Sequence, residues 1–321
     1  MNKILCVYNI CGISKDNTEV YPSYLEKLVN QDFDGQIEFI VSACQPKERT
    51  IPHLKSLFPD VSYLDIKDRI PINVSFNHAV LKGIEKWGKF DGYVYVTCDS
   101  VMNTPYDIQN LFDIIDTNKN AGMVSARIDH DSCYSYGILL NGINHPQYDK
   151  IAEAMMFKDG QNYKMKPGQA CAAHVNLYSD RIQEYYGKCC PDVFSGYSTE
   201  SVFHTICSAL KLDWIIGNIL VGHTPSLDCP SAGFRPEAED RNSVPTYYQG
   251  FIDKNLKEII GEEYQKLGGV LENCQGIIPP NIENYDENGW IKNELLKEYI
   301  KENLYLSKEK FDYNKIDSEW Q

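Results

Sequence analysis

Tyr93-Val94-Tyr95-Val96-Thr97-Cys98-Asp99 is an apolar strand that ends in a carboxylate, and a polar turn over Ser100–Pro105 follows it. In open α/β sheets, ligands bind outside the carboxyl ends of the strands. Asp99 is therefore predicted to face a ligand. His223 has a similar position, because it follows a second apolar run, Ile215–Val221. A carboxylate oxygen and an imidazole at two strand ends are suited to bind one divalent cation.

The chain before Asp99 alternates between apolar strands and amphipathic helices. Strands are predicted at Ile4–Val7, Ile37–Val41, Val61–Leu64 and Tyr93–Thr97, and helices from Pro22, over Ile51–Phe58 and over Val74–Trp87. Strands separated by helical segments of this length indicate right-handed crossovers and a mainly parallel sheet. The pattern predicts an α/β fold with helices flanking a mixed sheet.

The chain after Asp99 is less regular. Strands are predicted at Gly122–Ala126, Ala172–Leu177 and Ile215–Val221, and helices over Leu111–Asp116, within Tyr197–Leu210, over Gln249–Leu267 and over Trp290–Leu304. Residues 129–170 are rich in Tyr, Asn, Asp and Gly and are expected to form loops over a cleft. We predict one domain over 1–225, with halves 1–103 and 104–225, and a C-terminal helical extension over 226–321. This extension would pack against the core or pair subunits in a homo-oligomer.

Composition restricts the class of partner. The 321 residues carry 31 Lys and Arg against 45 Asp and Glu, which gives a formal net charge of −14. This excess of acid argues against nucleic acid or an anionic membrane as the main partner. An anionic ligand would then need a metal ion to hold it.

Cysteine usage and hydropathy point to a reduced, cytoplasmic protein. The 11 cysteines are odd in number and show no CxxC spacing, so neither a disulfide framework nor a structural zinc site is predicted. No stretch reaches the roughly 18 apolar residues of a membrane span. We expect no transmembrane segment and no signal peptide.

The order of these elements resembles the GT-A fold glycosyltransferases, and the family 2-like group in particular, over roughly residues 3–225. The matching segments are Ile4–Asn9, Phe39–Cys44, Asn73–Gly83, Val94–Ser100, Ser198–His204 and Val221–His223. The resemblance implies a nucleotide-diphosphate sugar as donor and a glycan or other hydroxyl compound as acceptor. It also implies Mn²⁺ or Mg²⁺ as cofactor.

The resemblance assigns metal binding to two residues. Asp99 matches the metal-binding acid of the D-x-D motif, although Thr97-Cys98-Asp99 keeps only one of the two acids. His223 matches the late histidine of the family. His174 and His204 lie in core-like patterns and are expected to be structural.

The resemblance places the general base at the start of a helix, where the family has a Glu-Asp pair. This chain has Glu200-Ser201, so Glu200 is the candidate base and Asp192, on the preceding loop, is the second candidate. An acid in the first turn also stabilises a helix without any catalytic role. Inversion is expected from the resemblance, but Ser in place of Asp leaves a retaining mechanism open.

Donor contacts are predicted from single polar residues at strand and helix ends. The candidates are Tyr8, Asn9, Ser42, Arg69, Asn77 and Cys98. The family's acid after the second strand is absent from Val41–Cys44.

The sequence therefore predicts a metal-dependent glycosyltransferase, with two alternatives open. A non-catalytic sugar-nucleotide- or glycan-binding protein would explain the missing acids at Ser42, Thr97 and Ser201. A nucleotidyltransferase would need a Gly-rich basic loop after the first strand, and Asn9–Lys15 contains a single Gly.

Overall fold

The protein is described from a computed structural model. The structure describes residues 2–11, 20–68, 70, 72–128, 161–165, 174–190, 207, 210–223, 286–292, 294 and 312–321. Within these ranges no helix is long and apolar enough to cross a membrane.

The amino-terminal half alternates strand and helix as predicted. Its elements are β1 (Asn2–Cys11), α1 (Val20–Val29), β2 (Gly35–Cys44), α2 (Thr50–Leu57), β3 (Ser62–Ile66), α3 (Ile72–Trp87) and β4 (Gly92–Thr97). The strands are longer than their apolar runs because the backbone ladder continues into the flanking polar residues: β1 pairs with β2 from Asn2 to Cys11. Gly83 lets α3 approach β1 closely, since a Cβ there would lie 2.6 Å from a Leu5 methyl group.

The second half contains more short elements than the sequence pattern predicts. They are β5 (Ser100–Val101), α4 (Asp107–Thr117), β6 (Ala121–Ile128), β7 (Tyr163–Lys164), β8 (Val175–Ser179), α7 (Asp180–Tyr186), β9 (Asp213–His223) and β10 (Ser318–Trp320). β5 replaces the first part of the expected polar turn after Asp99. The helix expected within Tyr197–Leu210 lies almost wholly outside the described residues.

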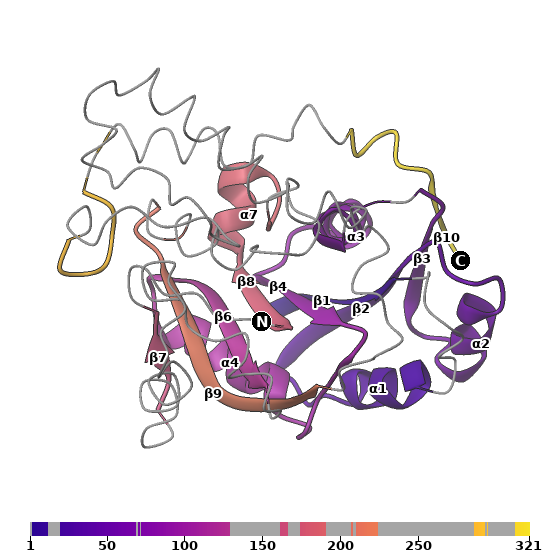
Figure 1. Ribbon diagram of the computed structural model, residues 1–321, viewed down its shortest axis with the longest axis horizontal. Coiled ribbons are helices and arrows are strands. Elements are labelled where there is room, and N and C mark those ends of the chain that lie inside the picture. Colours follow the sequence, from indigo (N-terminus) through magenta and orange to yellow (C-terminus); the bar gives the residue numbers. More distant parts are fainter. Residues whose placement is uncertain are drawn as a thin grey trace, which may run out of the picture.

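The strands form one mixed, mainly parallel sheet in the order β10-β3-β2-β1-β4-β8-β6-β9-β5, with β7 paired to β9 (Figure 1). Strands β1 to β4 are mutually parallel, and β6 and β9 are parallel to each other. Strand β8 runs antiparallel to both of its neighbours, β4 and β6. The amino end of β8 therefore lies at the same edge as the carboxyl ends of β4, β6 and β9.

Helices cover both faces of the sheet, and each face has its own buried core (Figure 1). On one face α3 and α7 pack against the sheet, with Phe76, Val80 and Ile182 buried between them. On the other face α1, α2 and α4 bury Leu25, Leu54 and other apolar side chains. This three-layer α/β arrangement confirms the predicted fold class.

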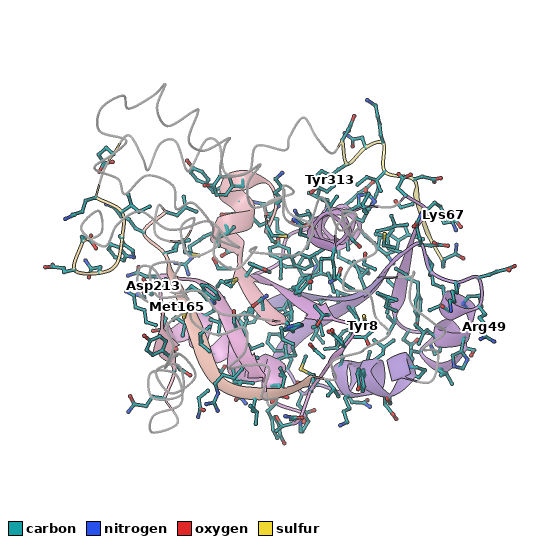
Figure 2. All side chains as sticks on the ribbon, viewed as in Figure 1. Tyr8, Arg49, Lys67, Met165, Asp213 and Tyr313 are labelled. Carbon is teal, nitrogen blue, oxygen red and sulfur yellow. The ribbon has the colours of Figure 1, made fainter. Side chains whose placement is uncertain are left out.

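Near the end of the chain the structure has a strand, and the C-terminal helical extension over 226–321 stays a prediction. Strand β10 pairs antiparallel with β3 and closes that side of the sheet. Most of the two helices expected at 249–267 and 290–304 lies outside the described residues. The boundary at residue 225 stays a prediction, but residues 312–321 pack on the first domain, as Figure 2 shows for Tyr313 beside α3.

Candidate functional site

Asp99 lies in the tight turn that joins β4 to β5 at the carboxyl edge of the sheet. Its side chain keeps a relative exposure of 23%, which is high for a residue directly after a buried strand. Hydroxyl groups on both sides fix the turn, since the Thr97 and Ser100 hydroxyls share a hydrogen bond of 2.8 Å. The turn thus leaves the Asp99 side chain part-exposed at the edge of the sheet, with Oδ1 buried on the side of His174.

Strand β5, which follows this turn, pairs with the carboxyl end of β9. In the antiparallel pairing of β5 with β9, Ser100 lies opposite His223 and Val101 lies opposite Gly222. The backbone of His223 is therefore the direct neighbour of the residue that follows Asp99. The predicted convergence of the two strand ends is present in the backbone, while the His223 side chain is outside the described residues.

His174 lies beside Asp99, a position that sequence reasoning missed. Its carbonyl accepts a hydrogen bond of 3.1 Å from the Thr97 N–H, which extends the β4–β8 ladder by one step. Its Nδ1 lies 3.6 Å from Asp99 Oδ1 and 3.3 Å from Thr97 Oγ1. The side chain has a relative exposure of 24%, so the expectation of a core histidine was wrong. The predicted strand Ala172–Leu177 placed His174 inside a strand, whereas β8 begins at Val175 and leaves His174 at its amino end.

Tyr8 and Cys98 stabilise the turn that contains Asp99. The Tyr8 hydroxyl donates a hydrogen bond of 2.9 Å to the Cys98 carbonyl, and both side chains are buried. Their contacts with a donor stay predictions. Tyr8 becomes a residue that positions the backbone next to Asp99.

Asn9 and Ser42 are completely buried, and their role as donor contacts stays a prediction. Asn9 Nδ2 donates to the carbonyls of Val7 and Val96, and Ser42 Oγ shares a hydrogen bond of 2.8 Å with Ser75 Oγ. Ser42 thereby ties β2 to α3, and Asn9 ties β1 to β4.

Asn77 has a structural role through its hydrogen bonds, and its contact with a donor stays a prediction. Its Oδ1 accepts hydrogen bonds of 3.1 Å from the backbone N–H groups of Cys189 and Cys190, and its Nδ2 donates to the Cys190 carbonyl at 2.6 Å. Nδ2 also lies 3.2 Å from the Tyr313 hydroxyl. The side chain is completely buried, so the amide serves to fix the turn after α7. Burial raises the pKa of the Cys189 thiol well above its usual range, so this thiol stays protonated.

Three of the predicted site residues cannot be placed. Arg69, Asp192 and Glu200 lie outside the described residues. Their assigned roles stay predictions.

The described residues supply an oxygen and a nitrogen donor at the Asp99 turn. A carboxylate oxygen and an imidazole nitrogen are both accepted by Mn²⁺, while Mg²⁺ prefers the oxygen. Over the part of the chain that the structure describes, no group of three or more His, Cys, Asp or Glu side chains could hold a metal ion. The fit to a metal therefore rests on Asp99 and its neighbours, with further ligands expected from outside those residues or from the substrate.

Solved structures share this arrangement of strands and helices. A mannosyltransferase from Pyrobaculum calidifontis, solved in complex with GDP-Man and Mn²⁺, superposes with a TM-score of 0.52 at 10% identity, over 92% of this chain and 69% of that one. The fold is of the GT-A type. A mycobacterial protein superposes with a TM-score of 0.50 at 13% identity, over 79% of this chain and 74% of its own. No protein-family model and no curated protein matches the sequence.

The resemblance to GT-A glycosyltransferases is thus confirmed at the level of the fold. Within this GT-A fold, the turn at Asp99 and the pairing of β5 with β9 occupy the carboxyl edge of the sheet. This is the edge at which open α/β sheets bind their ligands.

Proposed function

We propose that the protein is a metal-dependent glycosyltransferase that moves a sugar from a nucleotide-diphosphate donor to a hydroxyl acceptor. The observation that carries the proposal is the pairing of Ser100 with His223, which brings two distant strand ends together beside a part-exposed carboxylate. The part-exposed turn at Asp99 is formed by segments more than 100 residues apart in the chain, and it lies at the edge where open α/β sheets bind their ligands. A ligand at this edge would explain why the two segments converge there.

The proposed metal would be bound by Asp99 and would offset the charge of the diphosphate. Leaving-group departure from a sugar donor develops negative charge on the diphosphate, and a divalent ion stabilises such charge as a Lewis acid. The chain carries 14 more acidic than basic side chains and therefore repels a diphosphate overall. A bound cation would supply the positive charge that attracts the diphosphate to the site.

The acceptor hydroxyl needs a base, and Glu200 is the residue that we propose for it, with Asp192 as the second candidate. A carboxylate within hydrogen-bond reach of the hydroxyl removes its proton as the oxygen attacks the anomeric carbon. Direct attack by the acceptor would invert the configuration at that carbon. Inversion is the outcome that we propose.

The test is a donor panel assayed by released nucleotide. The full-length protein is incubated with UDP- and GDP-sugars, with Mn²⁺, with Mg²⁺ and with EDTA, and free UDP or GDP is measured over time. Metal-dependent release from one donor supports the proposal. Donor binding in the same buffers without release over long incubation would identify a non-catalytic binding protein.

A further inference from the structure

We infer that His174 is a further side-chain ligand of the cation at Asp99. This inference deepens the proposed function and rests on it. It adds a residue from β8, an antiparallel strand, to a site predicted from β4 and β9 alone.

The sheet fixes the position of His174 through its backbone. Val175 pairs with Val96 in the β4–β8 ladder, and the Thr97 N–H donates to the His174 carbonyl, so His174 lies opposite Thr97. Residues directly opposite each other in an antiparallel pair project to the same face of the sheet. The imidazole therefore reaches the Asp99 turn without any rearrangement of the backbone.

The distance between the two side chains suits a shared ion better than a direct hydrogen bond. His174 Nδ1 lies 3.6 Å from Asp99 Oδ1, and a separation of this size is too long for a hydrogen bond. Two ligands that are each about 2.1 Å from one metal ion lie about 3.0 Å apart at a right angle and about 3.4 Å apart at the tetrahedral angle. A small rotation of either side chain closes the remaining difference.

Thr97 Oγ1 is the second polar neighbour of the imidazole, and its contact with Nδ1 is compatible with metal binding by Nδ1. Thr97 Oγ1 lies 3.3 Å from His174 Nδ1, which is a long hydrogen bond, and 2.8 Å from Ser100 Oγ. If the Thr97 hydroxyl donates to Ser100 instead, the Nδ1 lone pair becomes available and Nε2 carries the proton. The Asp99 and His174 side chains have relative exposures of 23% and 24%, and Asp99 Oδ1, which faces His174, is buried within this turn.

The test measures metal binding directly and needs no donor. Mn²⁺ is titrated into the full-length apoprotein, and free Mn²⁺ is followed by its electron paramagnetic resonance signal. We expect His174→Ala and His174→Gln to raise the Kd for Mn²⁺ by tenfold or more, with unchanged circular dichroism. His53→Ala, which removes an exposed histidine from α2, is the matched control and should bind Mn²⁺ as the wild type does.

Pulsed measurements then identify the nitrogen ligand. Electron spin echo modulation from ¹⁴N reports an imidazole bound directly to Mn²⁺. Because His223 is also a predicted ligand, the informative variant is His223→Ala: modulation should persist in it and vanish once His174→Ala is added. A histidine that only orients the carboxylate would leave His223→Ala without ¹⁴N modulation, which would overturn the assignment.

The two proposals fail in different ways. Mn²⁺ binding that depends on His174, together with no nucleotide release from any donor, would refute the proposed transfer and leave this assignment in place. Mn²⁺-dependent nucleotide release with wild-type Mn²⁺ affinity in His174→Ala would refute this assignment and leave the transfer in place. An apoprotein that binds no Mn²⁺ would also refute the assignment.

Discussion

Asn77 lies within α3 and Asp99 lies in the turn after β4, and the surroundings of the two side chains are opposite. Asn77 is completely buried, and its amide is held by the backbone of Cys189 and Cys190 and by Tyr313. Asp99 is 23% exposed, and His174 approaches it without a hydrogen bond between them. A buried polar group with its hydrogen bonds made stabilises a fold, whereas a part-exposed carboxylate and imidazole have surface that a ligand can contact.

The largest effect is expected from Asp99→Asn. Removal of the carboxylate charge should lower Mn²⁺-dependent nucleotide release at least about 100-fold, which corresponds to about 2.7 kcal/mol in the barrier. Stability should change little, because the side chain is part-exposed at a turn. Initial rates and the urea midpoint are the two measurements.

Asp116→Asn is the charge-matched control for that variant. Asp116 is an exposed residue near the end of α4, so its loss removes one negative charge away from the turn. Equal rates in Asp99→Asn and the wild type would contradict the role that we give to Asp99.

The opposite result is expected from Asn77→Ala. The change leaves two backbone N–H groups and one carbonyl without the partner that Asn77 provides, and we expect a loss of about 3 kcal/mol in the free energy of unfolding. The variant that remains folded should keep its affinity for Mn²⁺. Asn110→Ala, an exposed position on α4, should shift the urea midpoint only slightly. A stable Asn77→Ala protein that fails to bind donor would restore Asn77 to the donor site.

Local sequence patterns predicted one side of this contrast and missed the other. The strand that ends at Asp99 and the strand that ends at His223 are both marked by apolar runs, so their convergence at one edge follows from a parallel sheet. The partners of Asn77 are 113 and 236 residues away, and no periodicity connects them. The position of Asn77 in the sequence therefore does not predict these long-range hydrogen bonds.

His174 was missed because the direction of β8 is not encoded in its apolar pattern. A parallel β8 would carry His174 to the far edge of the sheet, where a core or surface role is expected. The structure runs β8 antiparallel to β4, which turns its amino end toward Asp99. Strand order and direction depend on contacts between segments far apart in the chain, and a single sequence does not show them.

His78 offers a pH test of the buried region. Its Nε2 lies 2.7 Å from Ser318 Oγ, it stacks on Tyr313, and burial lowers its pKa to about 4. In the unfolded chain His78 binds a proton near pH 6.5, whereas in the folded state it binds one only near pH 4. The free energy of unfolding should therefore fall as the pH drops from about 6.5 to about 4. The expected loss from this group is about 2–3 kcal/mol, measured as urea midpoints at several pH values.

His78→Gln removes this titration and should flatten that part of the pH profile. His53→Gln removes an exposed histidine and should leave the profile unchanged. The same pH dependence in His78→Gln and the wild type would show that His78 is not the group responsible.

The smallest effect, and the sharpest contrast, is expected from two tyrosines. Tyr8 and Tyr63 are both buried, and each hydroxyl donates to a backbone carbonyl: Tyr8 to Cys98 at 2.9 Å and Tyr63 to Phe58 at 3.0 Å. Substitution by Phe should cost each about 1 kcal/mol in the free energy of unfolding. Only Tyr8→Phe loosens the backbone beside Asp99, so only this variant should bind Mn²⁺ more weakly, by a few-fold. Equal Mn²⁺ affinity in the two variants would mean that the Asp99 turn keeps its geometry without the Tyr8 hydroxyl, and that Thr97 and Ser100 suffice to hold it.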